Sequence, residues 1–180
     1  MAKKKVIIVH GWNSAPDDCW FPWLRSTLEK DGVRVSVPAL PDPKNPNIEK
    51  WVSLVQKEAG TSGGDTYFVG HSLGAYIILS IIERLPENTT IGGALLIAGR
   101  THLRDKSKIN VEKVRAKNCF IYGIFSDDDY YVDVAESRYF EEYLGAKTTI
   151  LHNRGHFSRV EGAKEVPEIL IALKDMLGKN

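Results

Sequence analysis

Short runs of β-branched and other apolar residues alternate along the chain with longer segments whose apolar residues recur at helical spacing. Most of the short runs are continuously apolar, which favours a parallel sheet covered on both faces. The runs are KVIIVH (5–10), VRVSV (33–37), TYFVG (66–70), IGGALLIAG (91–99), CFIYGIF (119–125) and KTTILH (147–152). Helices are predicted near 21–31, 47–59, 72–85, 131–143 and 163–177. This alternation indicates a doubly wound α/β fold with a mostly parallel sheet of about six strands.

Two segments interrupt this alternation. The proline-rich stretch PALPDPKNPN (38–47) is expected to be a surface loop. The basic segment 100–118 is the long connection, and we interpret it as a solvated surface, with a small lid or a pocket rim as the alternative. Because the sequence contains no repeat, low-complexity tract or linker, residues 1–180 are expected to form a single domain.

The bulk composition is that of an ordinary globular protein. Hydrophobic residues make up 43% and charged residues 26%, and the formal net charge is +1. That charge gives no electrostatic basis for binding nucleic acid or an anionic membrane surface. The apolar run VIIV behind the lysines at 3–5 is too short for a signal peptide, and no stretch approaches the ~18 residues of a membrane span. A cytoplasmic protein is therefore expected. Cys19 and Cys119 form no metal or redox spacing, and Cys119 is predicted to be buried and inert.

The segment VGHSLGAY (69–76) contains a G-x-S-x-G match centred on Ser72. The motif is short, but a predicted strand leads into it and a strongly apolar helix follows, which is the context it requires. A nucleophilic serine must lie on a sharp turn where strand and helix approach closely, so Gly70 and Gly74 omit side chains that would collide. The backbone N–H of Leu73 would lie at the helix N-terminus, where it can stabilise an oxyanion.

A serine hydroxyl needs a general base before it can act as a nucleophile. The histidines are His10, His71, His102, His152 and His156. His156 follows the last predicted strand, and loops after parallel strands meet at the carboxyl edge of the sheet, where ligands bind. We therefore predict that His156 converges on Ser72 as the base, with His102 as the runner-up. His10 and His71 are expected to structure the glycine-flanked turns in which they lie.

Three consecutive aspartates in FSDDDYYVDV (125–134) lie between Ser72 and His156. The order serine, acid, histidine is that of α/β-hydrolases, and the acid fixes the tautomer of the base. We favour Asp129, which stands three residues before the apolar Val132, with Asp128 second. Asp127 is expected to form a turn or a helix cap.

The first predicted strand ends in VHGWNSAPDDCWFPWL (9–24). A His-Gly turn at this edge can direct a second backbone N–H at the reaction centre, and Trp12 is the expected donor beside Leu73. Trp20, Phe21 and Trp23 follow this turn. We interpret them as core packing of the first helix, with a wall of an acyl pocket as the alternative.

The combination of HGW, DDCWFPWL, GHSLGA, SDDDYYV and GHF resembles the small serine hydrolases of the YdeN and retinoblastoma-binding-protein-nine type. The likeness extends over nearly the whole chain and implies a minimal, capless α/β-hydrolase fold. It also implies a triad of Ser72, Asp129 and His156 with Trp12 and Leu73 as oxyanion donors. Many such relatives place proline directly after the acid, whereas Asp129 precedes Tyr130.

The predicted function is hydrolysis of small carboxylic esters through a covalent acyl-enzyme, with no metal or organic cofactor. A thioesterase, amidase or acyltransferase would use the same residues. A protein-binding module on a hydrolase scaffold is the alternative from another class, because fold alone does not define function. The expected ligand is a small ester-like molecule, not nucleic acid or a membrane. A lipase is disfavoured because the 100–118 segment is charged and not an apolar lid.

Overall fold

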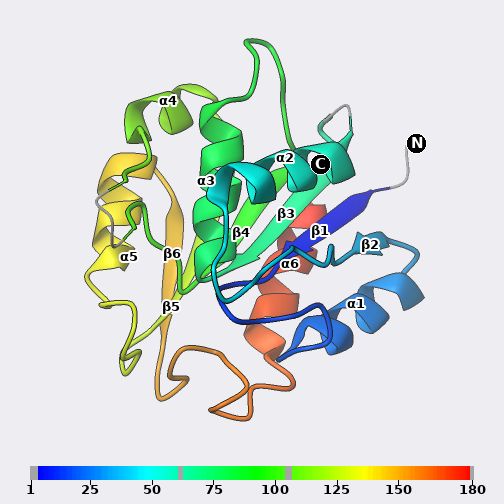
Figure 1. Ribbon diagram of the computed structural model, residues 1–180, viewed down its shortest axis with the longest axis vertical. Helices are drawn as coiled ribbons and strands as arrows, with labels where there is room; N and C mark the ends of the chain where they lie inside the picture. The colour runs from blue at the N-terminus through cyan, green and yellow to red at the C-terminus, as the bar shows by residue number, and fades with distance from the viewer. Residues whose placement is uncertain (1–3, 61–62, 104–106, 179–180) are drawn as a thin grey trace.

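The computed structural model describes residues 4–60, 63–103 and 107–178. Its centre is a six-stranded sheet in the order β2-β1-β3-β4-β5-β6, in which every neighbouring pair is parallel (Figure 1). The strands are β1 (Lys5–Val9), β2 (Arg34–Ser36), β3 (Thr66–His71), β4 (Gly93–Ile97), β5 (Ile121–Ser126) and β6 (Lys147–Leu151). The predicted α/β fold with six strands is therefore confirmed, and each strand lies within or next to its predicted run.

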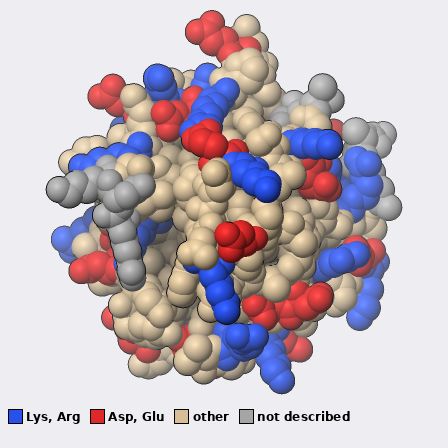
Figure 2. All heavy atoms as spheres, in the orientation of Figure 1, with Lys and Arg blue, Asp and Glu red and all other residues tan. Residues whose placement is uncertain are grey.

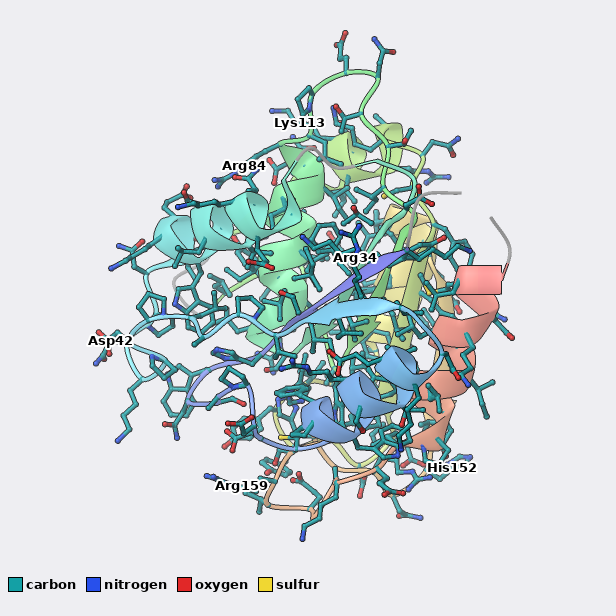
Figure 3. The ribbon with its side chains drawn as sticks, turned by 90° about the vertical axis from the view of Figure 1, so that its right-hand side faces the viewer. Arg34, Asp42, Arg84, Lys113, His152 and Arg159 are labelled. Carbon is teal, nitrogen blue, oxygen red and sulfur yellow. The ribbon has the colours of Figure 1, made fainter. Side chains whose placement is uncertain are left out.

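Helices cover both faces of the sheet. The helices are α1 (Phe21–Lys30), α2 (Ile48–Ala59), α3 (Leu73–Glu83), α4 (Val111–Ala116), α5 (Glu136–Tyr139) and α6 (Pro167–Gly178), and α5 continues into the π-helical turn η1 (Phe140–Leu144). Figures 1 and 3 show α1 and α6 on one face and the others on the opposite face. This two-sided cover explains why the central strands are apolar without alternation: all six positions of β3 are buried.

The helix α3 is the most deeply buried helix of the fold. Its nine residues from Gly74 to Ile82 are all buried, which agrees with an apolar sequence on every side of the helix. It packs against β3 and between α2 and α4. The helix that follows Ser72 is therefore fixed by the core, and so is the turn at its beginning.

The second half of the segment 100–118 is mostly exposed, as expected of a solvated surface, but it contains a helix that was not predicted. Residues 104–106 lie outside the described residues, but α4 begins at Val111, and Ile109 and Val114 are buried. Asn110 caps this helix because its side-chain oxygen accepts from the N–H of Lys113. Two apolar residues among many lysines and arginines were too weak a pattern to indicate a helix, and only packing against α3 and η1 reveals it.

Two helix starts also differ from the predictions. The helix predicted from 131 begins at Glu136, because the side chains of Asp129 and Asp133 accept from backbone N–H groups at 131, 132 and 135 and hold this stretch in turns. The helix predicted from 163 begins at Pro167, since proline favours the first helical turn.

The strand order reverses between β1 and β3. From β1 the chain moves outward to β2, and it then returns to β3 and continues in the other direction through β6. Loops that leave the carboxyl ends of β1 and β3 therefore diverge and leave a crevice, the usual ligand site of open α/β sheets. In Figure 1 the loop after β1 and the loop after β6 lie near each other below this edge.

Charged residues of both signs are interspersed over the face seen in Figure 2, without a patch of one sign among the described residues. This distribution agrees with a formal net charge of +1. Among the described residues, no helix is both long and apolar enough to cross a bilayer.

At Gly74 the helix α3 lies very close to the backbone at the end of β1. A substitution that adds a side chain there should therefore destabilise the protein. A Cβ at this position would lie 2.0 Å from the Val9 carbonyl oxygen and 2.9 Å from that of His10. Backbone atoms of a buried strand cannot move aside cheaply, so Gly74→Ala should lower the free energy of unfolding by about 3 kcal/mol, as measured by urea denaturation. The control is Gly64→Ala, where the space is open and the change should stay within about 0.5 kcal/mol. Equal stability of the two variants would contradict the close approach.

Candidate active site

The turn that carries Ser72 connects β3 to α3. Ser72 has φ 54° and ψ −116°, a conformation that residues with a side chain rarely adopt. Its N–H donates to the Ile97 carbonyl of the neighbouring strand at 2.9 Å. Gly70 permits the turn on the other side, because a Cβ there would lie 2.7 Å from the Ala75 nitrogen. The roles predicted for Gly70 and Gly74 therefore agree with the contacts, and Ser72 is half-buried at the carboxyl edge of the sheet.

His156 lies in the loop after β6 and forms a buried pair with Asp129. The Nδ1 atom of His156 lies 2.8 Å from one Asp129 carboxylate oxygen and 3.0 Å from the other. The side chains are 8% and 1% exposed. An ionised carboxylate only accepts hydrogen bonds, so Nδ1 carries the proton and Nε2 keeps a free lone pair. This arrangement has the tautomer that a general base for a hydroxyl requires.

All three aspartates bind the loop that carries His156, each at a different position. Asp127 accepts from the exposed His152 and from the Asn153 N–H, and Asp128 accepts from the Gly155 N–H at 2.8 Å. Asp129 is the one that reaches the imidazole of His156. Three adjacent negative charges are therefore tolerated in the loop after β5, because each carboxylate binds a different set of hydrogen-bond donors.

These donors also lower the pKa of the two exposed acids. The hydrogen bond from His152 holds the pKa of Asp127 below its usual value, and that from Ser126 does the same for Asp128. Because each folded-state pKa is depressed, the stabilisation is present above the ordinary aspartate pKa and is lost as pH falls through the folded value. The contacts between the two loops therefore persist near neutral pH.

His71 holds the backbone of His156 in place. Its Nε2–H donates to the His156 carbonyl oxygen at 2.8 Å, and the two ring centroids are 5.1 Å apart. Burial, followed by the nearby charge of His156, lowers the pKa of His71 to about 4. His71 is therefore neutral near pH 7. Its sequence position predicted a structural role in a turn, but the residue that it holds was not predicted.

His10 organises the first loop in a comparable way. Its Nε2 accepts from the Leu40 N–H at 3.2 Å, so its Nδ1 carries the proton and donates to the Gly11 carbonyl at 3.0 Å. In a planar trans peptide the carbonyl and the following N–H point in opposite directions. The Trp12 N–H consequently points away from His10. The backbone of Gly11 passes close to the serine turn, since a Cβ on it would lie 3.1 Å from Ser72 Cβ and 3.7 Å from the Leu73 nitrogen.

A cavity of about 660 Å³ joins these groups, a volume in the range of small-molecule sites. Ser72 and His156 both line it, as do Trp12 and Leu73. Among the described residues, no hydrogen bond joins the Ser72 hydroxyl to His156, and such contacts often form only with substrate bound. The first part of the basic segment also reaches the cavity through Arg100, His102 and Leu103. The alternative of a pocket rim therefore describes residues 100–103 better than a solvated surface does.

The aromatic set after the first turn belongs to the core. Trp20 and Phe21 are fully buried and Trp23 is packed against the core, and none of the three lines the cavity. The predicted packing role is therefore confirmed. Both cysteines are half-buried free thiols, and burial raises the pKa of each to about 11. Cys119 was predicted to be buried, which is wrong, but its high pKa agrees with the inert character predicted for it.

The parallel sheet, the strained strand–turn–helix at Ser72 and the histidine on a late loop define a protein of the α/β-hydrolase class. The chain belongs to the serine hydrolase family, which residues 6–175 match. It is therefore a hydrolase.

Two curated relatives and one crystal structure resemble the whole chain. The putative hydrolase YdeN of Bacillus subtilis is 28% identical over 185 residues, covering 98% of this chain and 97% of YdeN. The serine hydrolase RBBP9 of Rattus norvegicus is 25% identical over 186 residues, covering 96% and 95%. The crystal structure of the ydeN gene product superposes with a TM-score of 0.91 at 27% identity, over 98% of this chain and 100% of the other. The predicted resemblance is confirmed.

The three aspartates predict a graded series of Asp→Asn variants. In Asp129→Asn the amide oxygen must keep accepting from the Tyr131 and Val132 N–H groups, so its NH₂ faces His156 and imposes the wrong tautomer. Hydrolysis of para-nitrophenyl acetate should fall by about 10³–10⁴-fold in kcat. Asp127→Asn changes an exposed contact and should alter kcat less than about threefold. Equal, mild losses in both variants would contradict the assignment of Asp129.

His71 predicts a second pair of variants. His71→Phe removes the donor to the His156 carbonyl, whereas His71→Gln keeps an N–H at a similar distance from the backbone. A lost buried hydrogen bond costs about 1–3 kcal/mol, so kcat should fall about tenfold or more in the Phe variant and recover largely in the Gln variant. His152→Gln is the matched control, because the His152 side chain is 81% exposed. Equal activity of the Phe and Gln variants would show that the donor does not matter.

Proposed function

We propose that this hydrolase cleaves small carboxylic esters through a covalent acyl-enzyme formed on Ser72. The observation that carries the proposal is the buried bond between His156 and Asp129. It leaves Nε2 of His156 with a free lone pair, and His156 lines the same cavity as Ser72. A pair of this kind, beside a serine in a strained turn, activates a hydroxyl.

In the proposed reaction His156 Nε2 accepts the Ser72 proton while the Ser72 oxygen attacks the ester carbonyl. The backbone N–H groups of Trp12 and Leu73 stabilise the oxyanion, and each such donor is worth about 3 kcal/mol of barrier. His156 then gives its proton to the leaving alcohol. The same imidazole then accepts a proton from water while the water oxygen attacks the acyl carbonyl. The bond between the acyl carbon and the Ser72 oxygen breaks, His156 returns the proton to that oxygen, and the acid leaves.

The surroundings of His156 suit this proton transfer. Asp129 stabilises the imidazolium that forms, because its own charge is buried and directed at Nδ1. His71, in contact below, remains uncharged near pH 7 and so adds no repulsion to the imidazolium. Both effects support the proposed gain and loss of a proton by His156 in each half of the reaction.

A fluorophosphonate probe tests the proposal directly. The wild-type protein should be labelled at Ser72, and a folded Ser72→Ala variant should remain unlabelled, because only an activated serine attacks the phosphorus. Mass spectrometry of the labelled peptide identifies the site, and circular dichroism verifies the fold of the variant. A correctly folded wild type that resists labelling would falsify the proposal. A panel of esters, thioesters and amides of the same acyl group then measures the preference among carbonyl substrates.

A further inference from the structure

Arg100 places a positive charge in the wall of the cavity that holds Ser72 and His156. It follows β4 at the carboxyl edge of the sheet, is half-buried, and lines the cavity beside the apolar Leu73 and Val132. Within the described part of the chain its guanidinium forms no hydrogen bond or ion pair, although such a group has five donors. A half-buried arginine with unused donors in a ligand-sized cavity is a binding group for an anion.

Two acids near Arg100 have hydrogen-bond partners of their own, whereas the buried Oε2 of Glu136 has none among the described residues. Asp129 is bound to His156, and Asp133 accepts from the Ala135 N–H at 2.8 Å. Glu136 faces His102, with 3.7 Å between Oε1 and Nδ1, and it interacts with Arg100 only at longer range. Arg100 also lines a neighbouring hollow together with Asp127, Asp129 and Asp133. These carboxylates reduce the positive potential at the site, but among the described residues none of them forms a hydrogen bond with the guanidinium.

The other arginine of the cavity lining differs in this respect. Arg159 extends from the loop after β6 toward the first loop (Figure 3), where its Nη1 lies 3.2 Å from an Asp18 carboxylate oxygen. Asp18 also accepts from Ser14 and from the Ala15 N–H. This pair contributes no net charge to the cavity, so Arg100 is the lining arginine without a paired carboxylate among the described residues.

We propose that Arg100 binds an ionised carboxylate of the substrate, so that the preferred substrates are small esters carrying a second, free carboxylate. This inference rests on the proposed esterase function and names its substrate class. A single guanidinium matches one negative charge in bidentate geometry, which favours a carboxylate over a dianionic phosphate. Leu73, Tyr131 and Val132 supply apolar contact for the carbon chain between the carboxylate and the ester.

Two pairs of nearly isosteric substrates test the charge preference on each side of the ester bond. On the acyl side, the para-nitrophenyl monoester of adipic acid is compared with the same ester of adipic acid monoamide. On the alcohol side, para-acetoxybenzoate is compared with para-acetoxybenzamide. The value of kcat/KM for each is divided by its rate of alkaline hydrolysis, which removes differences in intrinsic reactivity. In the wild type, the corrected kcat/KM of the carboxylate substrate should exceed that of the amide substrate by about tenfold or more in one pair. Hydrogen bonds to charged groups change a binding constant by about this factor.

Substitution of Arg100 should then abolish the preference. In Arg100→Gln the carboxylate-to-amide ratio should fall to about one, mainly through a higher KM for the carboxylate ester. Arg100→Lys keeps the charge but not the planar fork, and its ratio should be intermediate. Arg25→Gln is the matched control: it removes the same charge from an exposed ion pair on α1 and should keep the wild-type ratio.

The outcomes separate this inference from the proposed function. Suppose that the enzyme reacts with fluorophosphonate and cleaves the ester bond of the carboxamide-bearing substrates, but that the carboxylate-to-amide ratio is near one for both pairs. This result would overturn the role of Arg100 alone. The same holds if Arg100→Gln and Arg25→Gln lower the ratio equally, which would indicate a general effect of net charge. Failure of labelling at Ser72 would instead remove the esterase itself.

Discussion

The contact between the helix α3 and the end of β1 determines the geometry of the whole site. At Gly74 the helix touches the backbone of Val9 and His10, and a single added carbon atom would overlap a carbonyl oxygen. This approach holds the Ser72 turn against the loop that begins at Gly11. Ser72 and the loop that begins at Gly11, some sixty positions earlier in the chain, therefore line the same cavity. Strain at Ser72 persists because buried packing of α3 outweighs it.

Side chains with no proposed part in the chemistry do much of the positioning. His10 fixes the direction of the Gly11 peptide, and His71 fixes the backbone of His156. Both are buried, and burial lowers the pKa of each, so both hold defined tautomers and carry no charge near pH 7. Glu161 ties the same region together, since it accepts from Tyr130 and from Ser158. A network of neutral and paired groups thus surrounds the one imidazole that is proposed to change its protonation state.

The cavity combines apolar walls with charges that are mostly compensated. Asp18 neutralises Arg159, and Asp129 faces His156. Arg100 differs because none of the carboxylates near it forms a hydrogen bond or an ion pair with its guanidinium among the described residues. The proposed preference for a substrate carboxylate follows from this position, because an ionic group is costly to bury without a counter-ion.

The sequence by itself determined the order of strands and helices and the turn at Ser72, because continuous apolar runs and glycine spacing are local signals. It also indicated His156 as the histidine at the same edge of the sheet, because His156 follows the last predicted strand. It narrowed the acid to three neighbours and favoured Asp129. Only tertiary structure decided which carboxylate contacts His156, since neighbouring side chains on a turn point in different directions. It also revealed α4, whose one buried residue, Val114, forms no pattern in the sequence, and the positions of His71 and Arg100. Those roles arise from contacts between segments far apart in the chain, which no local pattern of residues encodes.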